Sequence, residues 1–183
     1  MATSLGGSGP HRTDRDGRTL TGPDRPLELA LRLANAAGCA AELIHALHAL
    51  HARQWTLEDL TRGADTSIGQ IASAKRDIDA SNSRRHRLID QIDGHVLHAA
   101  SGHRLYSETV GELIDRLLIL ELKQHALREG EDTAAANESA DLNRHLAELV
   151  NELVADLAAG RAKLPPRFGV KVYRQQRNVG APA

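Results

Sequence analysis

A long helical pattern runs from residue 68 to residue 100, and the face that it would bury carries charge. Positions at alternating steps of four and three keep one face of a helix toward its neighbours. On this face stand Ile71, Lys75, Ile78, Asn82, Arg85, Ile89, Ile92, Val96 and Ala99. Because three of these residues are polar, the pattern predicts both a long bundle helix and a candidate site within it.

Composition favours helices over sheets throughout the chain. Aromatic residues make up only 2% of the sequence, so the core must consist of Leu, Ile, Val and Ala. Such residues suit close-packed helices, whereas sheets are enriched in aromatic residues. A chain of 183 residues is long enough for one domain with a sizeable core. We therefore expect an all-α fold, an antiparallel bundle of about four main helices with one short helix.

Local start and stop signals predict where the first helices lie. Pro26 suits the first turn of a helix that the apolar spacing carries to about Arg53. Thr56 then has the character of an N-cap, and it predicts a short helix that ends at Gly63. One of residues 65–67 is expected to cap the long central helix.

Two further helices are predicted after the central one. Thr109 and Glu112 have the spacing of a capping box, before a helix at 113–128 that is apolar around most of its circumference. Asp132 or Thr133 opens the last helix, which Gly160 ends. Its expected apolar stripe is Leu142, Leu146, Leu149, Leu153 and Leu157.

The predicted bundle domain, 26–160, lies between two segments of different composition. Residues 1–25 are rich in Gly and Pro and lack a periodic apolar face, so we expect a disordered leader. Residues 161–183 carry six cations and no acid, which predicts an extended basic tail. Two roles stay open for this tail: a solvated segment that lies over the bundle, or an arm that contacts an anion or a partner.

Charge and cysteine content exclude several classes of protein. The net charge of −1 argues against nucleic-acid binding, and no apolar run is long enough for a membrane span. Cys39 is the only cysteine, so a fold held by internal disulfides is excluded and the cytoplasm is the expected location. We interpret Cys39 as a small buried hydrophobe and Trp55 as a core residue, with a binding surface as the alternative for Trp55.

The polar residues of the central helix form the main candidate site. Lys75, Asn82 and Arg85 are expected to face Asp115, Arg116 and Glu112 on the apolar helix, with Asp79 nearby. Buried cations need partners. Either they pair internally with these acids, or Lys75, Arg85 and Arg116 grip an anionic ligand such as a phosphate or carboxylate. In the second case Asp115 or Asp79 is the candidate proton-transfer residue.

The sequence contains one incomplete motif for a metal site. Glu42 and His45 have the Glu-x-x-His spacing that di-iron bundles use. The sequence holds no second copy of this motif, which a carboxylate-bridged metal pair requires. We therefore expect no cofactor, and a metal-dependent bundle oxidase is the least favoured function.

Polar residues recur in an order that is similar to a known family. The segments are Leu50-His51, Trp55-x-x-Glu58-Asp59, Lys75-Arg76-x-Ile78-Asp79-x-x-Asn82-x-x-Arg85, Ile89-Asp90-x-Ile92-Asp93 and Glu108-Thr109-x-Gly111-x-x-x-Asp115-Arg116-Leu117-x-Ile119-Leu120-x-x-Lys123. They resemble the bacterial family of domain of unknown function 4254 over roughly residues 45–125. Thr56, Val110 and Leu118 depart from its pattern, where His, Pro and Ser would be expected. The resemblance implies an all-helical fold and an association with sugar-transferring or other biosynthetic enzymes.

Two functional hypotheses follow from these observations. The first is a non-catalytic helical accessory protein of a biosynthetic pathway, a homodimer or a partner of another protein, because the apolar helix at 113–128 exceeds what one small bundle must cover. The alternative is a small enzyme or binding protein with a site for an anionic small molecule inside the bundle. Whether the protein is an enzyme stays open at this point.

Overall fold

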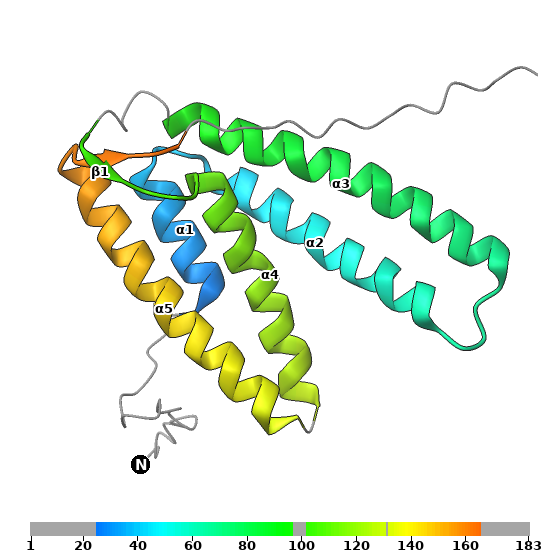
Figure 1. The fold of residues 1–183 in the computed structure, drawn as a ribbon. Helices are drawn as coiled ribbons and strands as arrows, with labels where there is room; N and C mark the ends of the chain where they lie inside the picture. Colours follow the sequence, from blue (N-terminus) through cyan, green and yellow to red (C-terminus); the bar gives the residue numbers. More distant parts are fainter. Residues whose placement is uncertain (1–24, 97–101, 131, 166–183) are drawn as a thin grey trace, which may run out of the picture.

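The structure is a computed structural model that describes residues 25–96, 102–130 and 132–165, and this part of the chain is almost wholly helical. Its helices are α1 Pro26–Ala36, α2 Ala41–Arg62, α3 Ile68–Val96, α4 Val110–Glu129 and α5 Thr133–Ala158 (Figure 1). The short strands β1 Arg104–Leu105 and β2 Ala162–Lys163 pair in parallel. The predicted all-α bundle is confirmed. The predicted leader, apart from Arg25, and the tail beyond Pro165 lie outside the described residues.

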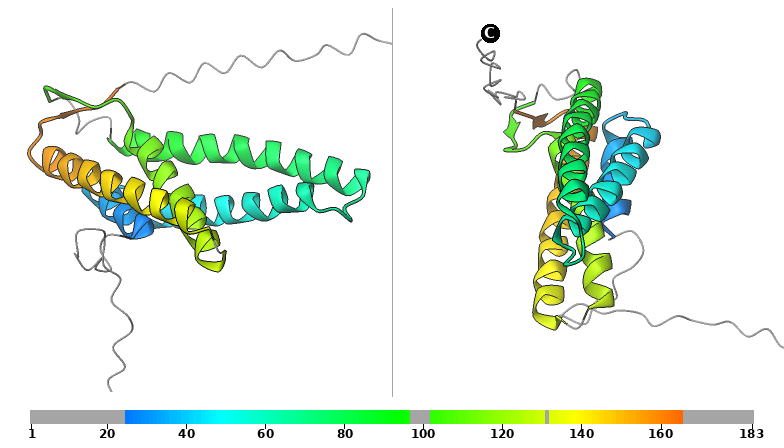
Figure 2. Two further views of the ribbon diagram at one scale, coloured as in Figure 1. Left: turned by 60° about the horizontal axis from the view of Figure 1, so that its bottom comes forward. Right: turned by 90° about the vertical axis from the view of Figure 1, so that its right-hand side faces the viewer.

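Helix α4 lies at the centre of the arrangement. Helices α2 and α3 form a long hairpin, while α1 and α5 pack against α4 and against each other. Because α4 also contacts both α2 and α3, it joins the hairpin to the α1–α5 pair (Figure 1). Figure 2 shows the closed end of the hairpin extending beyond the other helices. The part of the hairpin that meets α4 is therefore where three helices converge.

The predicted first helix is broken into α1 and α2, so its expected continuity to Arg53 is wrong. Gly38 adopts a φ of +74° just after α1. Its N–H donates to the Asn35 carbonyl at 3.1 Å, and the Cys39 N–H donates to the Ala34 carbonyl at 2.8 Å. These two bonds form a Schellman motif, which ends helices at a left-handed glycine. The short helix of the bundle is therefore α1.

The expected restart at Thr56 is also wrong, because α2 continues through it to Arg62. The Thr56 hydroxyl donates to the Ala52 carbonyl at 3.2 Å, one turn back in the same helix, and caps nothing. Gly63 does follow the helix, as predicted. Cys39 is buried, and its Sγ donates to the Ile92 carbonyl at 3.4 Å, which agrees with its interpretation as a core residue.

The start of α4 confirms the predicted capping box. The Thr109 hydroxyl accepts from the Glu112 N–H at 3.1 Å, and the Glu112 carboxylate accepts from the Thr109 N–H at 3.0 Å. The body of this helix is enclosed by its four neighbours within one chain. Its core residues are each 2% exposed or less: Val110, Leu113, Ile114, Leu117, Leu118 and Leu120. These residues are covered within one chain, so they do not by themselves require a second protein, and the homodimer stays a prediction.

Helix α5 begins and ends as predicted, but one residue of its expected apolar stripe is exposed. Asp132 caps its start by accepting from the Ala135 N–H at 2.9 Å, and Gly160 follows its end with a φ of +64°. Leu142 is 43% exposed, against expectation, whereas Leu146 and Leu153 are buried.

The residues just beyond α5 fold back onto the bundle through one buried acid. Asp156 is 1% exposed, and its carboxylate accepts from the Tyr106 hydroxyl at 2.6 Å and from the Arg161 Nε at 2.9 Å. Arg104 lies 3.2 Å from the same carboxylate. Burial and the adjacent carboxylate raise the pKa of Tyr106 to about 12. The cluster holds the β1–β2 pair against the end of α5.

Replacing Gly111 by Ala should lower the free energy of unfolding by about 1–3 kcal/mol, the usual cost of overpacking. An added Cβ would lie 2.8 Å from Asp93 Oδ1 and 2.9 Å from the Ile89 carbonyl oxygen, which is backbone and cannot turn away. Urea denaturation followed by circular dichroism measures the change. Gly94→Ala is the matched control, because nothing lies within 4 Å of its Cβ and Ala is favoured inside a helix by about 0.5–1 kcal/mol. Equal stabilities for the two variants would contradict this packing.

Candidate functional site

The centre of the candidate site is a buried acid that pairs with two bases from different helices. Asp115 on α4 is 6% exposed. Arg85 on α3 donates to both of its carboxylate oxygens, from Nε at 2.8 Å and from Nη2 at 2.7 Å. His51 Nε2 on α2 lies 2.8 Å from Asp115 Oδ1. We call these three residues the His–Asp–Arg cluster.

The charge state of this cluster follows from its contacts. Burial by itself would raise the pKa of Asp115, but the hydrogen bonds from His51 and Arg85 outweigh it and hold that pKa below its usual value. An ionised carboxylate only accepts hydrogen bonds, so His51 Nε2 must donate. In the neutral imidazole the other nitrogen, Nδ1, then keeps its lone pair. The cluster therefore orients a histidine whose second nitrogen can act as a base.

Beside the cluster lies a groove of about 340 Å³ between α2, α3 and α4. Its volume falls at the lower end of the range for small-molecule sites. Trp55, half-buried, contributes apolar surface from α2. The full lining is His51, Gln54, Trp55, Glu58, Asp59, Arg62, Arg85, Ile119, Leu122 and Lys123. The predicted role of Trp55 as a simple core residue is thus replaced by a place in the wall of a groove.

Some polar groups in the groove already have an ion-pair or hydrogen-bond partner, and others do not. Arg62 lies 3.6 Å from Glu58 and 3.7 Å from Asp59, all on α2. Gln54 donates from Nε2 to Asn82 Oδ1 at 2.9 Å, which ties α2 to α3. Lys123 is exposed and has no ion-pair partner within the described residues. The groove therefore offers one uncommitted cation.

Several residues predicted for the site lie elsewhere. Lys75 and Asp79 are exposed. Their half of α3 lies beside α2 and beyond the other helices (Figures 1 and 2), and it buries a narrow seam that includes Ala74 and Ile78 instead. Arg116 is exposed and pairs with Glu108 at 3.0 Å, because the next position along α4 after Asp115 is turned toward solvent.

Of the predicted set, the structure brings together Arg85 and Asp115, with Asn82 beside them through Gln54. Glu112 is exposed and serves the capping box, so it does not line the groove. For Arg85, internal pairing and an anionic ligand were the two alternatives. In the structure Arg85 is paired with Asp115 through both carboxylate oxygens.

His51 is the site residue that sequence reasoning missed. A signal for it existed, because Ile44, Leu47 and His51 stand at helical steps of three and four, and all three are buried. A histidine on a buried face requires a polar partner. The partner, Asp115, lies 64 residues away in the sequence, and periodicity along one helix cannot identify it.

The residues considered for metal binding lie on the surface of the bundle. Glu42 and His45 are both exposed on the first turns of α2. Across residues 25–96, 102–130 and 132–165, no group of three or more His, Cys, Asp or Glu side chains has a geometry that could hold a metal ion. None of the helices in this part of the chain has the length and apolar character that a membrane crossing requires.

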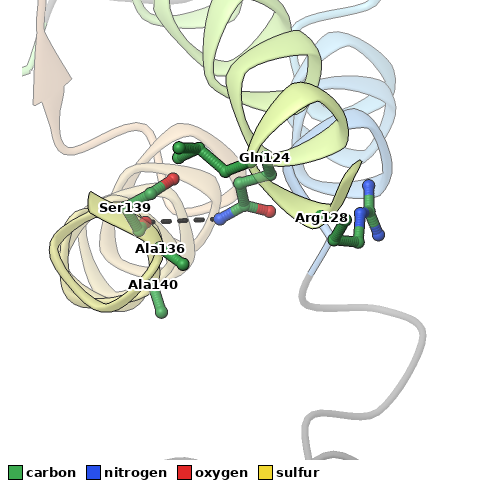
Figure 3. A pocket seen from close by; sticks show the side chains of 6 residues that line it. Gln124, Arg128, Ala136, Ser139 and Ala140 are labelled. Carbon is green, nitrogen blue, oxygen red and sulfur yellow. Dashed lines mark hydrogen bonds between the residues drawn. The ribbon is translucent and has the colours of Figure 1, made fainter. Parts of the chain in front are cut away.

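A second, smaller hollow lies between α4 and α5, with a volume of about 30 Å³ (Figure 3). Gln124 crosses it and donates from Nε2 to the Ser139 carbonyl at 3.2 Å. A space of this size can hold a water molecule but not an organic ligand. The groove beside the His–Asp–Arg cluster is therefore the stronger candidate for a functional site.

Some of the residues that resemble the known family, from three helices, meet at this groove, whereas others such as Lys75 and Arg116 do not. Those that meet there include Trp55, Glu58 and Asp59 of α2 and Lys123 of α4, which line it, and Asp115, which lies behind it. A sequence model described as "Protein of unknown function (DUF4254)" matches residues 41–166. No curated protein and no solved structure matches the chain.

Proposed function

Because the chain belongs to the DUF4254 family, whose activity is not established, we propose a function from the geometry alone. The groove between α2, α3 and α4 is a binding site for a small molecule, and His51 is the residue that exchanges a proton there. The observation that carries this proposal is the His–Asp–Arg cluster, which places a buried, oriented imidazole in the wall of a groove.

The energetics of the cluster support a functional role. Exchanging a buried ion pair for apolar residues of similar size is often neutral or stabilising, so such a pair is weak evidence for stability alone. Here His51 and Asp115 are 5% and 6% exposed. Perturbed carboxylates in a cleft are also a recognised indicator of functional sites.

The chemistry that these residues can perform is proton transfer. Asp115 fixes the orientation of the His51 ring, and Arg85 balances the charge of Asp115. A neutral histidine with a free nitrogen lone pair is suited to general-base catalysis or to accepting a ligand hydrogen bond. No hydroxyl or thiol side chain lines the groove in the described residues. A covalent mechanism with a serine or cysteine nucleophile is therefore not supported.

A second candidate function is a helical accessory protein of a biosynthetic pathway. The observation that favours it is the projecting hairpin end, where Leu60 is 42% exposed and Ile68 is 87% exposed. Exposed apolar side chains at a projecting tip suit contact with another protein. The two functions are compatible, because the groove and the hairpin end are different surfaces. We propose a cytoplasmic location for either, on the basis of the single cysteine.

Native mass spectrometry of the full chain, incubated with a small-molecule extract of cells, tests the groove. We expect a small-molecule adduct on the wild type and on His45→Gln, since His45 is exposed on the same helix. His51→Gln should lose the adduct while keeping a cooperative unfolding transition. An adduct equally abundant on all three proteins would place binding outside the groove, and the absence of any adduct on the wild type would refute the proposal.

A further inference from the structure

We infer that the ligand of the groove is a small organic monocarboxylate with an apolar body. The carboxylate is bound by Lys123, and the body lies against Trp55 and the apolar surface of α4. This inference rests on the proposed function and specifies the chemistry of the ligand. It also differs from the sequence-based hypothesis, in which Lys75, Arg85 and Arg116 were to grip the anion.

The argument for Lys123 comes from the state of the cations that line the groove. The Nε–Nη2 edge of Arg85 is bound to the Asp115 carboxylate, at 2.8 and 2.7 Å, so the charge of Arg85 is already offset by a buried acid. Arg62 stands within 4 Å of Glu58 and Asp59 on its own helix. Lys123 alone of these three cations has no acid beside it within the described residues. An incoming anion therefore meets its free positive charge at Lys123.

The surface next to Lys123 is apolar. Ile119 and Lys123 are four residues apart on α4, so their side chains occupy the same face of the helix, and Leu122 also lines the groove. Trp55 lies in the wall that α2 supplies. A ligand that reaches Lys123 from within the groove must bury carbon against these side chains. This arrangement favours an amphipathic acid over a compact, fully hydrated anion such as inorganic phosphate.

The acids in the groove limit the ligand to one negative charge. Glu58 and Asp59 lie on α2, opposite the α4 surface that carries Lys123. A second anionic group on the ligand would have to lie near these carboxylates, and like charges brought together in a groove repel each other. Dicarboxylates and doubly charged phosphate monoesters are thus disfavoured relative to monocarboxylates.

Intrinsic fluorescence offers a direct test, because Trp55 is the only tryptophan in the chain. The probes are phenylacetate and hexanoate, each compared with its neutral amide, in titrations of the full chain. We expect a saturable change in Trp55 emission with the acids and a dissociation constant about tenfold weaker for the amides, the equivalent of one charged hydrogen bond. Lys123→Gln should weaken binding of the acids by a similar factor and leave the amides unchanged. Lys75→Gln, which removes an exposed lysine outside the groove, is the matched control.

The outcomes separate this inference from the proposed function. Equal binding of acid and amide, or no effect of Lys123→Gln, would overturn the monocarboxylate assignment. No saturable response to either acid at millimolar concentration would overturn it too. In each of these cases, an adduct that His51→Gln loses would still support a small-molecule site in the groove. If that adduct were also absent, both ideas would fail.

Discussion

Replacing Asp115 by Leu should lower the free energy of unfolding by about 3 kcal/mol. The substitution leaves the Arg85 guanidinium and the His51 ring without their common acceptor in the interior. Removing one partner of a buried pair usually costs about 3–5 kcal/mol. The lower end applies here because the Arg85 side chain is 28% exposed and can turn toward water in the groove. Urea denaturation at neutral pH measures the loss.

The double variant Asp115→Leu with Arg85→Met is the control for this experiment. It removes the stranded cation together with the acid, so most of the lost stability should return. His51 still lacks its acceptor, and recovery should therefore be incomplete. If the single and double variants were equally unstable, loss of packing at Asp115 would explain the effect, and the ion pair would not.

The pH dependence of the same variant gives an independent check. The pKa of Asp115 is lower in the folded chain than in the unfolded chain, because the hydrogen bonds of His51 and Arg85 overcome the effect of burial. Such a group contributes stability above its unfolded pKa of about 3.9, and this contribution is lost as the pH falls through the folded pKa. The stability difference between wild type and Asp115→Leu should therefore be largest near neutral pH and shrink below about pH 4.

Replacing Leu117 by Ala should destabilise the protein by about 2–5 kcal/mol, the range for large-to-small changes in a core. Leu117 is 0% exposed on α4 and is enclosed by side chains of the same chain. Leu142→Ala is the control, since that leucine is 43% exposed and should change stability by only about 0.5 kcal/mol or less. Thermal and urea unfolding of both variants provide the measurement.

Protein concentration adds a second readout to the Leu117 experiment. If one chain covers α4 by itself, the unfolding midpoint should not depend on concentration. A midpoint that rises with concentration would show that association stabilises the fold. That result would support the predicted dimer, and the projecting hairpin end with Ile68 would be the first surface to examine.

The parts of the fold that were predictable are those in which the determining contacts lie within a few residues. Thr109 and Glu112 cap each other across one turn, and Asp132 bonds to the N–H three residues ahead. Capping of this kind depends on local geometry, so the sequence by itself determined these helix starts. The break at Gly38 is equally local. The small apolar residues on either side of it continue the helical pattern, so the apolar spacing predicted one continuous helix, which was wrong.

The candidate site was predictable only in part. The pairing of Arg85 with Asp115 followed from periodicity, because a cation on a buried face requires an acid. Which cations are buried depended on what packs against each half of the helix. Lys75 lies in the half of α3 that extends beside α2 beyond the other helices (Figure 2), and it is exposed. Arg85 lies near α4, within reach of Asp115.

Only the tertiary structure decided the composition of the His–Asp–Arg cluster and of the groove. Asp115 joins a histidine 64 residues away and an arginine 30 residues away, and no local spacing encodes those separations. They are set by how α2, α3 and α4 cross, which depends on the shapes of many aliphatic side chains packed together. The sequence by itself determined that the fold is helical and that charge lies within it. Packing determined which charges meet, because a salt bridge forms only where the backbone brings its two partners within a few ångströms.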